Sequence, residues 1–111
     1  MAPPDLAELE RFSDPSLLIL CSLADGPKHG YAITRDIEAF AGVTLGPGTL
    51  HGALARLRRL GLVEQLPERD RRRPYRLSAL GERVLEAQLA GAQRVVTTGR
   101  RRLRGDAGSS P

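Results

Sequence analysis

The side chains best suited to chemistry in this chain are arginines gathered in one polar stretch. Residues 56–76 hold eight arginines against three acidic side chains, and half of those arginines lie in the run PERDRRR at residues 67–73. A guanidinium group carries several N–H donors in one plane, which suits it to pair with phosphate oxygens. The stretch therefore indicates a polyanionic partner, while a solvated charged turn is the simpler alternative.

Charge is divided unevenly along the rest of the chain. Residues 1–55 carry three basic and seven acidic side chains, whereas residues 56–111 carry 14 basic and six acidic ones. A basic half joined to an acidic half favours nucleic acid as the partner.

The sequence lacks the motifs that catalysis needs. It contains no GxGxxG fingerprint and no HExxH motif, and the GPG run at residues 46–48 lacks the lysine and hydroxyl of a phosphate-binding loop. Cys21, His29 and His51 do not have metal-ligand spacing. We therefore expect no enzymatic activity, no metal site and no cofactor.

Length and composition predict one cytoplasmic domain. The 111 residues contain no apolar run of 18, and the start of the chain lacks the basic-then-apolar pattern of a secretion signal. Cys21 has no second cysteine to pair with, and we expect it to be a small buried side chain. No membrane contact is expected.

Three helices are predicted in the first half. Ser13, Asp14 and Pro15 form a helix start, and the apolar run up to residue 24 is typical of a central buried helix. A second helix, residues 29–40, turns Ile33, Ile37 and Phe40 inward and Arg35 and Asp36 outward. The third helix spans residues 47–60, ends at Gly61, and has a buried stripe formed by Leu50, Ala53, Leu54 and Leu57.

In the second half of the chain, the spacing of the apolar residues changes from a helical to a strand-like period. Residues 62–66 and 74–77 are predicted to form two strands, with PERDRRR as the turn between them. Ser78 then caps a fourth helix that we expect to reach residue 98, followed by a basic tail without regular structure over residues 99–111. Residues 1–12 are predicted to be a separate amphipathic segment.

This order of elements, mainly α with a small β-ribbon, predicts a winged helix-turn-helix domain over residues 13–77 and a dimerisation helix over residues 78–98. The third helix is the one whose outer face fits a major groove. The residues on its outer face have small side chains near the start of the helix, which lets the backbone approach bases closely. Thr49 and His51 on this face carry hydrogen-bonding groups. The arginines of the turn would then reach the flanking backbone or minor groove.

Several segments resemble the PadR family of transcriptional regulators. They are KHGY at residues 28–31, LGPGTLHGALARL at residues 45–57, GLVE at residues 61–64, RPYRLS at residues 73–78, and Gly81. The resemblance covers residues 15–98. It implies a homodimeric repressor whose C-terminal helix pairs with its copy and which responds to a small aromatic or apolar effector.

Two positions depart from the family pattern. His51 stands where the family usually has tyrosine, and Gly46 stands where it usually has serine before proline. Both changes bear on the operator sequence rather than on the fold. The chain also has no tryptophan, so an effector cannot stack between indole rings.

The residues expected to contact double-stranded DNA come from the three segments that the winged helix brings together: Lys28, Tyr31, Thr49, His51, Gly52, Arg56, Arg69, Arg71, Arg72 and Arg73. For Tyr31 a second interpretation is open, in which the ring packs beneath the third helix. The residues expected at the dimer interface share one apolar stripe of the fourth helix: Leu80, Val84, Leu85, Leu89, Ala92, Val95 and Val96.

Two other functions are compatible with the same sequence. A winged helix can also act as a protein–protein adaptor, and a basic domain can bind DNA without sequence preference as an architectural protein. Competition between specific and bulk DNA distinguishes them, since a specific regulator prefers its operator by roughly a thousandfold or more.

Overall fold

The computed structural model describes residues 14–105, which form four helices and a two-stranded ribbon. In detail, the regular elements are α2 (Pro15–Leu23), α3 (Gly30–Ala41), α4 (Pro47–Arg59), β1 (Val63–Gln65), β2 (Tyr75–Leu77) and α5 (Ala79–Leu103).

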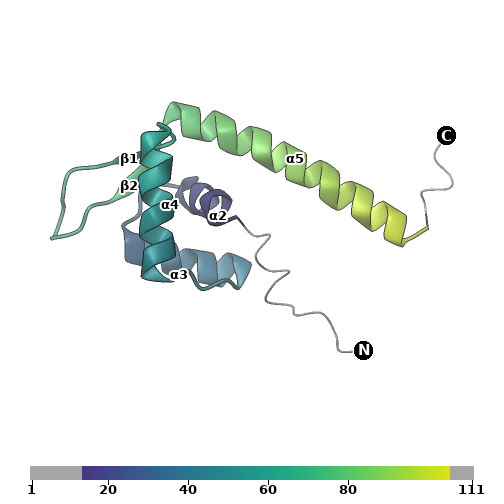
Figure 1. The fold of residues 1–111 in the computed structure, drawn as a ribbon, viewed down its shortest axis with the longest axis horizontal. Helices are drawn as coiled ribbons and strands as arrows, with labels where there is room; N and C mark the ends of the chain where they lie inside the picture. The colour runs from purple at the N-terminus through teal and green to yellow at the C-terminus, as the bar shows by residue number, and fades with distance from the viewer. Residues whose placement is uncertain (1–13, 106–111) are drawn as a thin grey trace.

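 Figure 1 shows α2, α3 and α4 clustered together, the ribbon projecting from one side, and α5 extending away from the cluster. The predicted fold class, mainly α with a small β-ribbon, is confirmed.

Helix α2 is the centre of the domain. Its first turn is capped by Asp14, whose Oδ1 accepts a hydrogen bond from the Ser16 amide at 2.9 Å, and Pro15 supplies a preset helical φ. Ile19, Leu20 and Leu23 are fully buried, and α2 packs against α3, α4 and α5. The all-round apolar sequence of this helix follows from that position.

Helices α3 and α4 each bury one stripe against α2. The predicted stripe of α4, Leu50, Ala53, Leu54 and Leu57, is confirmed as buried. In α3, Ile33 and Ile37 are buried, but Phe40 was wrongly assigned to the stripe, since half of its surface is exposed. Phe40 lies in the last turn of α3, where the helix has passed beyond the core.

The ribbon, called the wing below, consists of β1, β2 and the loop between them, residues 63–77. The strands are antiparallel with Glu64 opposite Arg76. Arg69 and Arg72 exchange two backbone hydrogen bonds, of 2.6 and 2.9 Å, around Asp70 and Arg71, which both have positive φ. Positive φ at both central residues is the pattern of a type I′ hairpin turn, so the arginine-rich run forms a tight, ordered tip.

The start of α3 is tied to the wing by a short backbone bridge. The Lys28 amide donates to the Tyr75 carbonyl at 3.0 Å, and the Tyr75 amide donates to the Lys28 carbonyl at 2.9 Å. Residues 28 and 29 therefore lie directly beside β2, which fixes the position of the wing relative to α3.

Helix α5 begins at a crowded junction. Ser78 Oγ donates to the Gly61 carbonyl at 2.6 Å and accepts from the Gly81 amide at 2.9 Å, which caps the helix. A Cβ atom at Gly81 would lie 2.1 Å from the Leu62 carbonyl oxygen, so only glycine permits this close approach of α5 to the segment before β1.

The predicted end of this helix at residue 98 is wrong. Helix α5 continues to Leu103 and is 25 residues long, so the tail expected from residue 99 is helical in its first part. Arginine is a good helix former, and positive charge near a helix C-terminus is favoured by the helix dipole, which explains why Arg100, Arg101 and Arg102 extend the helix. Residues 106–111 and the predicted N-terminal segment 1–12 lie outside the described residues. None of the described helices is long and apolar enough to cross a membrane.

Candidate nucleic-acid interface

The outer face of α4 is exposed and has little side-chain bulk at its start. Gly48, Thr49, His51 and Gly52 are all exposed, and Gly46 caps the helix without a side-chain hydrogen bond. No heavy atom lies within 4 Å of the position that a Cβ would occupy at Gly48 or Gly52. The helix backbone is therefore directly accessible along this face, as the sequence predicted.

The wing and the starts of α3 and α4 face one groove. Its volume is about 390 Å³, and it is lined by His29, Gly30, Tyr31, His51, Gln65, Arg72, Arg73 and Tyr75. Of the ten residues predicted to contact DNA, four lie here: Tyr31, His51, Arg72 and Arg73. We refer to this feature as the α4–wing groove.

Four of the other predicted contacts line two further hollows. Thr49, Gly52 and Arg56 line a hollow at the start of α4. Arg69 and Arg72 line a hollow beside the wing tip, together with Asp70. The wing-tip hollow adjoins the α4–wing groove, since His29 and Arg72 line both, whereas the hollow at the start of α4 shares no lining residue with the groove.

Tyr31 does not pack beneath α4. Its side chain is 65% exposed, and its hydroxyl accepts a hydrogen bond from Arg35 Nη1 at 3.1 Å. The Arg35 guanidinium carbon also lies 5.8 Å from the centre of the ring, and the contact with the hydroxyl raises the pKa of Arg35. Tyr31 and Arg35 therefore form an exposed pair at the edge of the groove.

Two arginines near the groove are held by other side chains. Arg56 Nη2 donates to Ser16 Oγ at 2.6 Å, which joins α4 to the first turn of α2. Arg76 pairs with Glu64 across the wing at 2.9 Å. Arg56 is nevertheless an exposed residue, and its guanidinium has further N–H donors that this single bond does not use.

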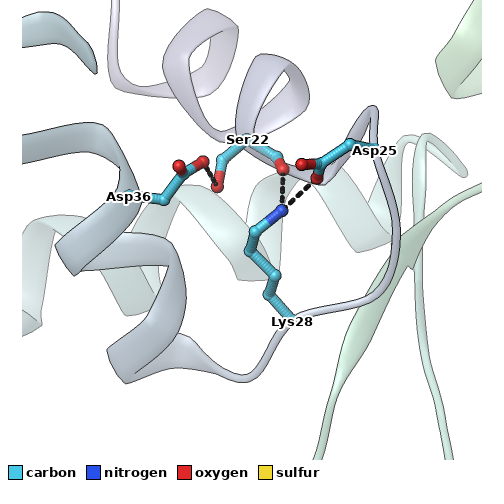
Figure 2. A network of polar contacts seen from close by, with 4 residues as sticks. All are labelled: Ser22, Asp25, Lys28 and Asp36. Atoms are coloured by element: carbon cyan, nitrogen blue, oxygen red, sulfur yellow. Dashed lines mark hydrogen bonds and ion pairs between the residues drawn. The ribbon is translucent and has the colours of Figure 1, made fainter. Parts of the chain in front are cut away.

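Lys28 has a different environment from the one expected. Its ammonium donates to the Ser22 carbonyl oxygen and to Asp25 Oδ1, and its side chain is only 18% exposed (Figure 2). The hydrogen bond and the positive charge of Lys28 lower the pKa of Asp25. Lys28 thus joins the end of α2 to the segment before α3, and its expected role as a DNA contact is corrected to a structural one.

Asp36 was also wrongly placed on the outer face of α3. Its Oδ2 accepts a 2.7 Å hydrogen bond from Ser22 Oγ, and Ser22 is almost fully buried (Figure 2). A buried hydroxyl needs a partner, and Asp36 supplies it from the neighbouring helix. Sequence periodicity alone does not reveal such a contact.

His29 is a residue of this site that the sequence interpretation missed. Its Nδ1 accepts a hydrogen bond from the Ala32 amide at 3.3 Å, which caps α3, and its Nε2 lies 3.0 Å from Arg72 Nη1 at the wing. The sequence feature that could have identified His29 is its position in the KHGY segment, directly before the glycine that begins α3.

The predicted dimer residues divide into two groups. Leu85 is only 5% exposed and belongs to the core of its own domain, with Val84 packed against that core, so the assignment of Leu85 to a dimer surface is wrong. The other five predicted residues are exposed in the single chain: Leu80, Leu89, Ala92, Val95 and Val96.

The remaining titratable groups do not suggest other chemistry. Cys21 is partly buried rather than buried as predicted, and this partial burial raises the pKa of its thiol, which keeps it protonated and poorly nucleophilic at neutral pH. Within residues 14–105, no three His, Cys, Asp or Glu side chains are grouped so that they could hold a metal ion. The geometry is that of an open, arginine-rich binding surface.

Comparison with known proteins assigns the chain to a family. The model of the "Transcriptional regulator PadR-like family" matches residues 19–87. A protein of Streptomyces fradiae, described as an uncharacterized 37.1 kDa protein in transposon TN4556, is 51% identical over 78 residues. That alignment covers 70% of this chain and 23% of the relative, so the chain spans less than a quarter of the relative's length.

Solved structures share the fold. A PadR-like transcriptional regulator from Bacillus cereus superposes with a TM-score of 0.76 at 18% identity, covering 86% of this chain and 96% of that one. BpsR of Bordetella bronchiseptica, whose DNA binding is regulated by 6-hydroxynicotinic acid, has a TM-score of 0.63 at 18% identity and covers 76% of this chain and 57% of its own. The chain belongs to the PadR-like family of transcriptional regulators and has a winged-helix DNA-binding fold.

Proposed function

We propose that this chain is a homodimeric repressor that binds double-stranded DNA through α4 and the wing and is released by a small-molecule effector. The observation that carries the proposal is the α4–wing groove. An exposed helix face with bare backbone at Gly48 and Gly52 lies beside a wing that presents Arg72 and Arg73. A helix of this kind enters the major groove, and arginines pair with the flanking phosphates.

The homodimer is supported by the part of α5 that extends beyond the domain. Leu89, Val95 and Val96 are large apolar side chains that remain exposed there. A two-fold partner would bury the same face of both chains. It would also present two copies of α4, which suits an operator with two half-sites about 34 Å apart.

Release by an effector is supported by family membership and by one structural relative. The regulation of BpsR by 6-hydroxynicotinic acid shows that a protein of this fold can couple DNA binding to a small molecule. In this chain the apolar face of α5 would supply leucine, valine and alanine side chains to a cavity at the dimer centre. An apolar compound suits such a lining better than a charged one.

The test is fluorescence anisotropy with DNA from directly upstream of the protein's own gene and with a scrambled duplex of equal length. Titrations at several salt concentrations, with bulk DNA as competitor, give both the affinity and the specificity. We expect a preference for the upstream fragment of roughly a thousandfold or more. Equal, weak binding to both duplexes would support an architectural protein, and binding to neither at low salt would support a protein–protein adaptor.

A further inference from the structure

His29 lies where three elements of the site meet. The backbone bridge between Lys28 and Tyr75 holds it against β2, and its own side chain caps α3. Its second ring nitrogen faces the wing, with Nε2 3.0 Å from Arg72 Nη1. Both residues line the α4–wing groove, so the space beside this contact is open to a ligand.

The hydrogen-bond capacity of the two side chains does not balance. A neutral imidazole has one N–H donor and one acceptor nitrogen, and a guanidinium has donors only. Two donors face the His29 ring, the Ala32 amide at Nδ1 and Arg72 at Nε2. The ring can accept only one of them. When Nδ1 accepts from Ala32, the proton is on Nε2, and this N–H points toward an N–H of Arg72.

We propose that an oxygen of a DNA phosphodiester supplies the missing acceptor and is bound jointly by His29 Nε2–H and the Arg72 guanidinium. A phosphodiester has no proton to donate near neutral pH and carries one negative charge, so it satisfies two converging donors and offsets the charge of the arginine. The amide end of α3, a helix of 12 residues, lies at the same place and favours an anion. Asp70 lines a neighbouring hollow that His29 and Arg72 also line, but among the described residues its carboxylate makes no hydrogen bond or ion pair with either of them.

This inference rests on the proposed function, because it requires a duplex on the α4–wing face. It goes further by assigning to His29 a contact with the DNA backbone. Such a contact does not depend on base sequence. It can therefore be tested on any duplex that the wild-type protein binds.

The test is a double-mutant cycle with His29→Ser and Arg72→Ala, measured by anisotropy on a 30-base-pair duplex at low salt. Serine is a preferred helix N-cap, so His29→Ser keeps an acceptor for the Ala32 amide and removes the Nε2 donor. Circular dichroism melting curves check that both variants remain folded. Arg94→Ala, on the exposed surface of α5, is the matched arginine control.

We expect each single variant to weaken binding about tenfold, as the loss of a hydrogen bond to a charged group does. The double variant should bind no more than about twofold worse than the weaker single variant, because both side chains act on one phosphate. Arg72→Ala should also reduce the steepness of the dependence of log K on log salt concentration by about 0.9, the value for one lost phosphate contact. Arg94→Ala should bind like the wild type.

Two results overturn the inference in distinguishable ways. If the wild type binds DNA and His29→Ser binds equally well, or the two substitutions add fully, the joint phosphate site is wrong and the proposed function stands. If the folded wild type binds no duplex at low salt, the proposed function fails and the phosphate site fails with it.

Discussion

At the scale of single residues, Gly52 shows how the site differs from an ordinary helix. It lies within α4 and is exposed, and apart from the adjoining backbone of its own helix no described atom lies within 4 Å of the position that a Cβ would occupy. A glycine inside a helix is less stable than alanine by about 1 kcal/mol, and nothing in the protein requires its small size. A ligand that approaches the helix backbone closely, as the edges of bases do in a major groove, would require it.

Gly52→Ala should therefore raise the free energy of unfolding by about 1 kcal/mol and weaken DNA binding roughly tenfold. Urea denaturation and anisotropy on the same protein sample measure the two effects. Gly99→Ala is the control, because Gly99 is an open glycine of α5 far along the helix from the domain. An unchanged DNA affinity for Gly52→Ala would mean that no base approaches α4 at this point.

Arg71 is a second residue whose conformation is unfavourable for the residue type. Its φ is +65°, in the left-handed region, which costs a non-glycine residue about 1 kcal/mol. Glycine is the usual residue at the second central position of a type I′ turn. An arginine here is explained if its charge acts on a partner.

Arg71→Gly should leave the protein as stable or up to about 1 kcal/mol more stable, and should lower DNA affinity for all sequences alike. The dependence of log K on log salt concentration should become less steep by about 0.9, the value for one lost phosphate contact. Thermal melting and salt-dependent anisotropy provide the two measurements. A variant with the affinity and slope of the wild type would remove Arg71 from the interface.

At the scale of elements, α5 contributes to the core in its second turn and leaves apolar side chains exposed farther along. Leu85 in its second turn completes the core of the domain, while Val96, three turns later, is 46% exposed. Leu85, Leu89, Ala92 and Val96 follow one another at spacings of four and three residues, so they form one continuous stripe. The first part packs on α2, and we propose that the rest packs on a second copy.

Substitutions along this stripe should separate its contribution to the core of the domain from its proposed contribution to a dimer. Leu85→Ala should lower the free energy of unfolding by about 2–5 kcal/mol, since it removes a buried leucine. Val96→Glu should keep the domain folded but shift light scattering from about 24 kDa, twice the chain mass of 12.0 kDa, toward that of the single chain. Arg94→Glu places the same charge on the opposite face of α5 and should stay dimeric. A Val96→Glu protein that remains a dimer would place the interface elsewhere.

The same helix shows what the sequence could and could not predict. The period of the apolar residues located α5 and its stripe, because periodicity reports which face is buried. It could not distinguish the core from a partner surface, since leucine and valine serve both, and so Leu85 was misassigned. Lys28 and Asp36 were misassigned for a related reason. Ser22 of α2 donates its hydroxyl to Asp36, and its carbonyl oxygen accepts from Lys28 beside Asp25, which lies only three residues before Lys28. Only the folded chain brings Ser22 to these side chains.

At the scale of the whole molecule, charge and shape support the same account. The acidic first half of the chain supplies α2 and α3, and the basic second half supplies the wing and the distal part of α5. The wing projects from the domain, and α5 extends away from it as a long arm (Figure 1). Two copies joined through α5 would place two copies of α4 on one duplex.

Hydroxyl-radical footprinting on the DNA upstream of the gene tests this account most directly. A two-fold regulator should protect two patches of the duplex whose centres lie about 10–10.5 base pairs apart, with Arg71→Gly weakening both patches equally. Protection of a single patch, or uniform protection along the whole fragment, would contradict the account.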